Sequence, residues 1–575
     1  MRRTPRRFLP PALAAVVLLA CLPVIPVRAE TVDLDVMHRI RSEAFFHSRV
    51  MDYLHVIADR NGPRVTGSPG YRRAAEAAIA ELEAAGIPNA TLETWGTFGR
   101  GWEWTRVAVQ MHAPQETTLT GIPADFSPGT DGPVRGTVAF APVWPHESDR
   151  PEDENLIRVA EQLERWMAEH TGRLAGRIVM LEHPLAWMLP EQQDVFRFSD
   201  EDLADLAASN DDQPLAPGPY PKLTWPLIEF PVEREAASRV WDVMPLEFAA
   251  DRWRMEAALR GRMFAFLVRE GVAAVLIPGY ESRAAVLFQS DFGTHEPAHA
   301  SPPPTVALMP EHYNRLHRLI ERGERVEVSV DVDATIFENQ PGQNVIAELP
   351  GTGRRGELVM LGAHLDSWHG ATGATDNASG SAVVLEVMRI LKTLGVPLQR
   401  TVRAALWDGE EQCLCGSRGY VRNHFADPVS MALKPGHGKL SAYFNLDNGS
   451  GRVRGVYLQG NDMARPIFEA WLAPFAEYGV STLTLTNTIG TDHLSFNAVG
   501  LPGFQFVQDP LDYNLNTHHS NVDDVGHISE GDLMQAAAVV ATAVYHTAQR
   551  EEMMPRKPLP APLPPKGPLP DELRD

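Results

Sequence analysis

Histidine and carboxylate side chains recur in the second half of the chain at positions that could bind metal ions and activate water. The candidates are His364, Asp366, Asp376, Glu410, Glu411, Asp447 and His519. Imidazole nitrogens and carboxylate oxygens are usual ligands of catalytic zinc, and a further carboxylate can take a proton from a water molecule. Two imidazoles with this many acids suffice for a pair of zinc ions. The residue types therefore indicate metal-assisted hydrolysis.

The strands that the sequence predicts would bring these candidates to one edge of a sheet. His364 ends a short apolar run, and Glu410, Glu411 and Asp447 each follow another, as expected for buried strands. His519 lies in the loop after a fourth such run. In open α/β sheets, ligands bind outside the carboxyl ends of the strands. Several independent strand ends thus predict one common site.

The two aspartates that follow His364 have separate expected parts. Asp366 could accept the second N–H of the His364 imidazole and so fix its tautomer. Asp376 comes twelve positions after His364, across a loop long enough to bring its carboxylate back. Its two oxygens could join two cations, although an aspartate before the helix expected at 377–394 could also be an N-cap.

Some assignments stay open when only the residues are considered. Of the adjacent Glu410 and Glu411, one could bind metal while the other takes the proton from water. His518 and His519 are equally eligible as ligands. Three further residues of nearby loops could line a substrate cleft or simply be loop residues: His369, Asp492 and His493.

Taken together, these motifs resemble the co-catalytic zinc exopeptidase family, which includes bacterial and yeast aminopeptidases, glutamate carboxypeptidase II and carboxypeptidase Q. The pattern covers residues 358–525, and the run HLDSW with an aspartate twelve positions after its histidine is most similar to the carboxypeptidase Q branch. His519, rather than His518, matches the family's His-Ser/Thr-x-x-Asp pattern. The resemblance implies hydrolysis of short peptides, with a homodimer as a possible assembly.

The same resemblance implies a role for each residue. His364 and Asp447 would bind one zinc ion, Glu411 and His519 the other, and Asp376 both. Glu410 would be the general base, and Asp366 the partner of His364. The family does not settle whether the enzyme removes N-terminal residues, removes C-terminal residues or cleaves free dipeptides.

Two other functions are compatible with the same fold class. A glutaminyl cyclase uses one zinc ion and no hydrolytic water, and the complete ligand set argues against it. A non-catalytic binding protein, as the transferrin receptor is, would be expected to have lost ligands or the base, and none is missing here. Two bound zinc ions and peptide cleavage would discriminate against both alternatives.

The organisation of the chain predicts a doubly wound, mostly parallel α/β domain that is discontinuous in sequence. We expect this catalytic domain at 30–113 and 335–552, with a separate β-rich, protease-associated-like insert at 114–334. The Pro- and acid-rich section 191–231 is predicted to be irregular or partly helical. The Pro-rich tail 553–575 is predicted to be extended or disordered.

Residues 1–29 have the pattern of an export signal, with a basic start, an apolar run and a small-residue cleavage site. This predicts a secreted or periplasmic protein. Lipidation at Cys21 is less favoured because Leu22 is a poor continuation of a lipoprotein motif. No other segment is expected to span a membrane.

The net charge of −22 argues against nucleic acid or an anionic membrane as partner. Cys413 and Cys415 are separated by one residue, a spacing that predicts no ordinary disulfide between them. We therefore expect both to be small packing residues.

Overall fold

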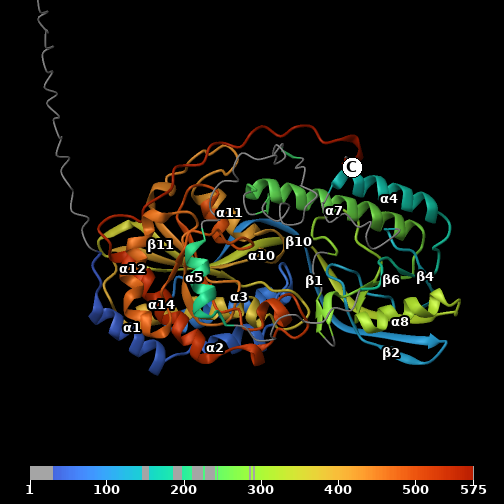
Figure 1. Ribbon diagram of the computed structural model, residues 1–575, viewed down its shortest axis with the longest axis horizontal. Helices are drawn as coiled ribbons and strands as arrows, with labels where there is room; N and C mark the ends of the chain where they lie inside the picture. The colour runs from blue at the N-terminus through green and yellow to red at the C-terminus, as the bar shows by residue number, and fades with distance from the viewer. Residues whose placement is uncertain are drawn as a thin grey trace, which may run out of the picture.

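The computed structural model describes residues 30–144, 155–185, 197–209, 225–226, 240–241, 244–283, 286–288 and 292–573. In this part of the chain, a 14-stranded mixed sheet extends through the molecule, in the order β15-β14-β16-β13-β11-β12-β10-β4-β5-β6-β9-β3, with β1 beside β10 and β2 beside β1. The predicted α/β class with a mostly parallel central sheet is confirmed (Figure 1).

Four parallel strands form the centre of the sheet beside the candidate residues. They are β12 (Arg400–Trp407), β11 (Arg354–His364), β13 (Leu440–Asn445) and β16 (Gly503–Gln508). All four match predicted apolar runs. β12, β13 and β16 are buried almost throughout and β11 from Val359 to His364, as expected for strands covered on both faces. Beyond β16 lie β14 (Val453–Tyr457) and β15 (Thr482–Thr484).

Helices cover both faces of this half of the sheet, so the sheet is doubly wound. One face packs against α1 (Leu34–Phe46), α9 (Ser379–Leu394) and α14 (Glu530–Gln549) through one large apolar core. The other face packs against α11 (Cys415–His424) and α13 (His493–Asn497) through a smaller aromatic core. The remaining helices of this half are α2 (Val50–Leu54), α3 (Pro69–Ala84), α10 (Glu410–Cys413) and α12 (Arg465–Leu472).

A long antiparallel ribbon connects the two halves of the molecule. It consists of β1 (Thr91–Ala113) and β10 (Glu327–Leu349), each 23 residues long. The sequence predicts two strands, at 90–95 and 104–112, where the structure has the single strand β1. The glycines between them do not end the strand, because register shifts in the ribbon accommodate them.

The insert adds its own parallel strands to the same sheet. These are β4 (Val134–Phe140), β5 (Ile178–Met180), β6 (Ala274–Pro278) and β9 (Thr305–Leu308), with β4 pairing antiparallel to β10. The shorter strands are β2 (Thr117–Leu119), β3 (Gly121–Pro123), β7 (Tyr280–Arg283) and β8 (Val286–Phe288).

The expectation of a separate, β-rich, protease-associated-like insert is not confirmed. Its strands continue the central sheet through β10, and its described residues contain more helix than strand. The helices are α4 (Leu156–His170), α5 (Asp200–Ala208), α7 (Leu246–Arg269) and α8 (Pro310–Glu321). The strands were recognisable as short apolar runs, whereas the 24-residue α7 has arginines and acids among its apolar residues and was missed.

Parts of two predictions fall on residues outside the described ranges. The export signal at 1–29 lies entirely outside them. Of the section 191–231, α5 confirms a helical part, and most of the rest is not described. The described helices include none with both the length and the apolar character needed to cross a membrane.

The C-terminal segment 553–573 is an ordered strap that crosses from the catalytic half to the insert. Figure 1 shows it in dark red, running over the top of the molecule to α7 and α4. Met554 is buried and its N–H donates to Ser441 Oγ at 3.1 Å. The prediction of an extended tail is confirmed, but this part is held in place because its backbone groups find partners on the folded surface.

Further along, the strap binds residues next to α7. The N–H of Leu563 donates to the carbonyl of Val429 at 2.9 Å, and that of Gly567 to the carbonyl of Trp225 at 2.8 Å. Lys566 forms an ion pair with the buried Asp251 of α7. The strap therefore connects α7 to the catalytic half.

Deleting 558–575 while keeping the Met554 anchor is expected to loosen α7. The deletion removes the Lys566–Asp251 ion pair and the hydrogen bonds of Leu563 and Gly567. Amide hydrogen exchange in 246–269 should become faster, because fewer contacts oppose local opening. Exchange in α9, which packs in a different apolar core from α7, is the internal control. Unchanged exchange in α7 would contradict a restraining role.

Candidate metal centre and active site

His364 lies at the centre of one group of buried carboxylates. Its Nε2 atom is 3.1 Å from Asp376 Oδ1, 3.6 Å from Asp447 Oδ1 and 3.9 Å from Glu410 Oε2. His364 ends β11, Asp447 lies two residues after the end of β13, and Glu410 begins α10 after β12. The parallel order of these strands brings the three residues together, as the sequence predicts.

His519 forms a second group that shares Asp376 with the first. Its Nε2 atom is 3.1 Å from Glu411 Oε2 and 3.5 Å from Asp376 Oδ2. His518 Nε2 is 4.0 Å from the same Asp376 oxygen, and the two imidazoles stack with their centroids 3.7 Å apart. Both histidines therefore remain within reach of this side of the site.

The donor atoms are close enough for metal binding. Candidate ligand atoms within 4.8 Å of one another occur in the groups His364–Asp376–Glu411, His364–Glu410–Asp447 and Asp376–His518–His519. Asp376 Oδ2 is buried and accepts no hydrogen bond from the residues that the structure describes, so one oxygen of the shared carboxylate is available to a cation. Asp376 does not cap α9, whose N-cap is Ala378. The donor set fits two divalent cations.

The carboxylate of Asp366 fixes the turn that carries the paired acids. It accepts the backbone N–H of Glu410 at Oδ1 and of Glu411 at Oδ2, both at 3.3 Å, and the hydroxyl of Thr66 at 3.0 Å. His364 Nδ1 is 3.0 Å from the Asp366 carbonyl oxygen and 3.7 Å from its carboxylate. The Asp366 side chain therefore orients the two glutamates more directly than it orients His364.

The electrostatics of the site favour a bound cation. Burial and the charges of Asp447 and Asp492 raise the pKa of Glu410 well above its ordinary value, although His364 opposes this. Burial and the charge of Asp376 do the same for the pKa of Glu411. Burial alone would raise the pKa of Asp376, but its hydrogen bond to His364 and that residue's charge outweigh burial and lower it. A cation would relieve this crowding of carboxylates.

The other polar residues that the sequence singled out have different surroundings. His369 and His493 are buried, and each has a ring nitrogen next to a backbone carbonyl, of Pro123 and Thr488 respectively. They are packed histidines and do not line the cavity described below. Burial raises the pKa of Asp492 to about 8, and the charge of Asp447 adds to this rise.

Comparisons with known proteins relate this chain to peptidases. Residues 344–544 match the family model "Peptidase family M28". Carboxypeptidase Q of Bos taurus is 29% identical over 309 residues, covering 54% of this chain and 61% of that protein. Aminopeptidase YwaD of Bacillus subtilis (strain 168) is 31% identical over 223 residues, covering 38% of this chain and 47% of that protein. The chain thus spans less than two thirds of these curated relatives.

Residues 344–544 are a peptidase family M28 domain. The crystal structure of a peptidase M28 precursor from Shewanella amazonensis SB2B has the same fold, with a TM-score of 0.60 at 20% identity, covering 92% of this chain and 98% of that chain. The likeness of fold therefore extends beyond the M28 domain to the helices before it and to the insert.

A cavity of about 700 Å³ opens over the metal-ligand candidates of the M28 domain. Its floor includes Asp376, Glu410 and Glu411, and much of its wall is α7, with Leu563 of the strap alongside. Trp368 also lines it and packs edge-on against His519, with ring centroids 5.7 Å apart. The insert and the strap therefore enclose the site that the M28 domain provides.

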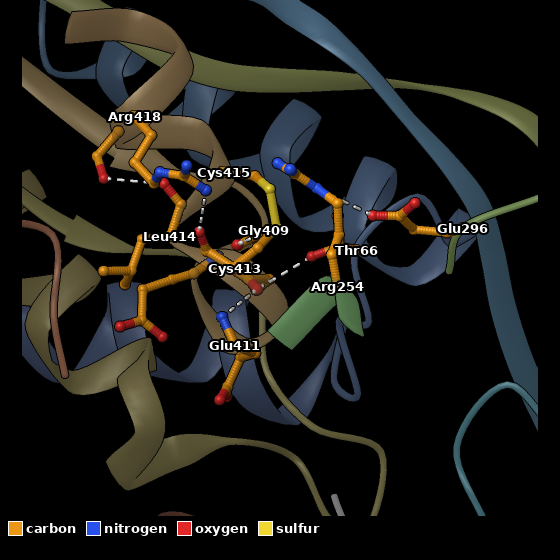
Figure 2. Close-up of a disulfide and its surroundings, with 12 residues drawn as sticks. Thr66, Arg254, Glu296, Gly409, Glu411, Cys413, Leu414, Cys415 and Arg418 are labelled. Carbon is orange, nitrogen blue, oxygen red and sulfur yellow. Dashed lines mark hydrogen bonds and ion pairs between the residues drawn. A yellow bond between two sulfur atoms is a disulfide. The ribbon is translucent and has the colours of Figure 1, made fainter. Parts of the chain in front are cut away.

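Cys413 and Cys415 form a disulfide at this cavity, directly after the paired acids (Figure 2). The expectation of two separate packing residues is wrong. Leu414 between them has φ +50°, and this left-handed conformation folds the chain so that the two Cα atoms are 4.9 Å apart. The disulfide closes the turn that follows Glu411.

Arg64 was not recognised from the sequence, yet it holds the loop between His364 and Asp376. Its guanidinium donates to the carbonyls of Leu365 at 2.6 Å, Thr372 at 2.5 Å and Gly373 at 2.8 Å. It is fully buried, and burial lowers its pKa to about 10, although Asp523 and Asp366 oppose the shift. The partners lie some 300 residues away in sequence, so no local pattern indicates them.

Replacing Arg64 by Met is expected to lower the free energy of unfolding by about 3 kcal/mol or more, because three buried carbonyls lose a charged donor. Chemical denaturation measures the change. Arg72→Met is the matched control, since Arg72 is exposed and pairs only with Glu76 on the surface. Equal stability of the two variants would show that the loop does not depend on Arg64.

Proposed function

We propose that the protein is a zinc-dependent exopeptidase that hydrolyses short peptides with two metal ions. The observation that carries this proposal is the pair of donor groups around His364 and His519, joined by Asp376 at the floor of a cavity. The family of the M28 domain and the printed names of its relatives support the reaction class.

The chain offers a ligand set for each ion. His364 and Asp447 would hold one, Glu411 and His519 the other, and Asp376 would contribute one oxygen to each. Bound zinc would polarise the peptide carbonyl and lower the pKa of the attacking water. The buried, hydrogen-bonded surroundings of these side chains keep them oriented for this task.

Glu410 is suited to move the proton. It lines the cavity next to both ligand groups, and Asp366 fixes its backbone. Its raised pKa makes it a stronger base than an ordinary glutamate, and a general base works best when its pKa is near the working pH. Glu410 would take a proton from the attacking water and return it to the leaving amine.

The cavity volume limits the substrate. Pockets of 300–1,000 Å³ typically enclose small ligands, and 700 Å³ suits a peptide of few residues. The wall formed by α7 and the strap would exclude a folded protein chain. An exported enzyme, as residues 1–29 predict, would meet such peptides outside the cytoplasm.

The test combines metal analysis with product identification. Purified protein should contain two zinc ions per chain by elemental analysis. A panel of free, N-acetylated and C-amidated dipeptides and tripeptides, digested with and without a chelator, should show chelator-sensitive cleavage by mass spectrometry. Metal-loaded protein that cleaves no peptide would refute the proposal and favour a binding protein or a cyclase.

A further inference from the structure

We propose that Arg260 of α7 binds a carboxylate of the substrate and so makes this enzyme require a free C-terminal carboxylate. The inference rests on the proposed peptidase function and extends it to the direction of cleavage. Arg260 lines the same cavity as the candidate base Glu410 and the shared ligand Asp376.

Arg260 is the arginine of the described cavity wall that has no carboxylate partner. Three arginines line the cavity, and two of them are paired with carboxylates. Arg254 is 2.7 Å from Asp251 and 3.7 Å from Glu296, and Arg418 is 3.0 Å from Glu247.

Arg260, in contrast, has no hydrogen bond, ion pair or ring contact with any residue in the described part of the chain, and its Nε is buried. A guanidinium always carries its charge and presents a planar fork of donors that matches a carboxylate. A partly buried guanidinium without a partner is therefore a suitable binding group for an anionic ligand.

The carboxylates of the described cavity wall outside the metal-ligand cluster already have partners within the protein. Glu256 is 2.9 Å from Arg252, and Glu247 and Glu296 have the arginine partners described above. Asp125 accepts the backbone N–H groups of Phe292 and Gly293 at 2.9 and 3.2 Å.

His295, the histidine of the wall outside the metal-ligand cluster, adds no positive charge. Burial lowers the pKa of His295 to about 4, so its imidazole is neutral at pH 7. Apart from the metal-ligand cluster and Asp125, whose carboxylate accepts backbone N–H groups, each charged side chain of the described cavity wall other than Arg260 has an oppositely charged partner. A substrate that spans the cavity would place a negative group there and its scissile carbonyl at the cluster.

The position on α7 fits a short peptide. Arg254, which Figure 2 shows near the turn of Glu411 and the disulfide, lies six residues before Arg260, or about 9 Å along the helix axis. Since an extended peptide advances about 3.3–3.6 Å per residue, a carboxylate one to three residues beyond the cleaved bond lies about 3–11 Å from it, a range that includes this length. This predicts a carboxypeptidase or dipeptidase rather than an aminopeptidase.

The test compares matched peptides in Arg260→Gln. The wild type should cleave a dipeptide with a free carboxylate at least tenfold more efficiently than its amide. In R260Q, kcat/KM for the free acid should fall by about 10- to 100-fold, the size expected for a lost charge-assisted hydrogen bond, while the amide changes little. Arg269→Gln, exposed on the same helix and outside the cavity, is the matched control.

A binding measurement separates this inference from the proposed function. In an E410Q background, calorimetry should detect binding of the free-acid dipeptide and a loss of about tenfold or more on adding R260Q. Equal binding with and without Arg260, whatever the turnover, would overturn the proposal. A dipeptide amide with an acidic second residue identifies the source of the carboxylate: binding that depends on Arg260 for this peptide alone would assign Arg260 to an acidic side chain and overturn the C-terminal assignment.

Discussion

Replacing Glu410 by Gln is expected to lower kcat by about 100- to 10,000-fold while both metal ions stay bound. The amide has nearly the same shape as the carboxylate but cannot accept the proton of the attacking water. The backbone of residue 410 still donates to Asp366, so the turn that carries Glu411 is preserved. The loss should appear in kcat rather than in KM, because the proton transfer belongs to the transition state.

Steady-state kinetics on one peptide, with metal content measured on the same sample, provides the test. Glu76→Gln is the matched control, since Glu76 is exposed on α3 and pairs only with Arg72. An E410Q variant that holds metal and turns over at the wild-type rate would remove Glu410 from the mechanism. Loss of metal together with activity would instead make Glu410 a ligand, as its 3.9 Å distance from His364 allows.

The sequence was sufficient to predict that these acids and imidazoles meet, because each follows a strand of a parallel sheet. The ends of β11, β12 and β13 lie at one edge by the geometry of the fold, so the position of a residue after its strand predicts its neighbours. The structure places His364, Asp376, Glu410, Glu411 and Asp447 together, with His519 beside them. Their individual roles remain predictions.

What the sequence did not indicate depends on long-range partners. Arg64 binds carbonyls about 300 residues away, and a basic residue between two helices has no periodicity that would point to them. The strap is similar: its prolines exclude a helix, but nothing in its composition indicates that Lys566 meets Asp251. The disulfide depends on the φ of Leu414, which a sequence pattern does not specify. Arg260 is distinctive only because its neighbours are paired elsewhere.

Replacing Asp376 by Ala is expected to remove most of the bound zinc and abolish peptide cleavage. Asp376 has an oxygen 3.1 Å from His364 Nε2 and another 3.5 Å from His519 Nε2, so its loss is expected to take a ligand from each ion. Even residues that only orient metal ligands lower metal affinity 10- to 100-fold when they are replaced, so removal of a shared ligand should lower it by at least about 100-fold.

Without metal, the D376A protein should be about as stable as the wild type. A difference between the two proteins with zinc then reports on metal binding. Burial and, after it, the nearby charge of Asp376 raise the pKa of Glu411, so removing that charge relieves repulsion between buried acids. The thermal midpoint of D376A without zinc should therefore be close to that of the metal-free wild type. Adding zinc at about 1,000 times its Kd should stabilise the wild type by about 4 kcal/mol and raise its midpoint, with little effect on D376A.

Asp524→Asn is the control for the zinc-dependent midpoint, since Asp524 is exposed in the same loop as His519 and accepts only the N–H of Gly526. An equal rise with zinc in D376A and the wild type would show that the ions bind without the shared carboxylate. If zinc raises the D376A midpoint by roughly half as much as the wild-type midpoint and one ion stays bound, Asp376 is a ligand of the lost ion only. Only the loss of both ions together supports a carboxylate that holds the pair.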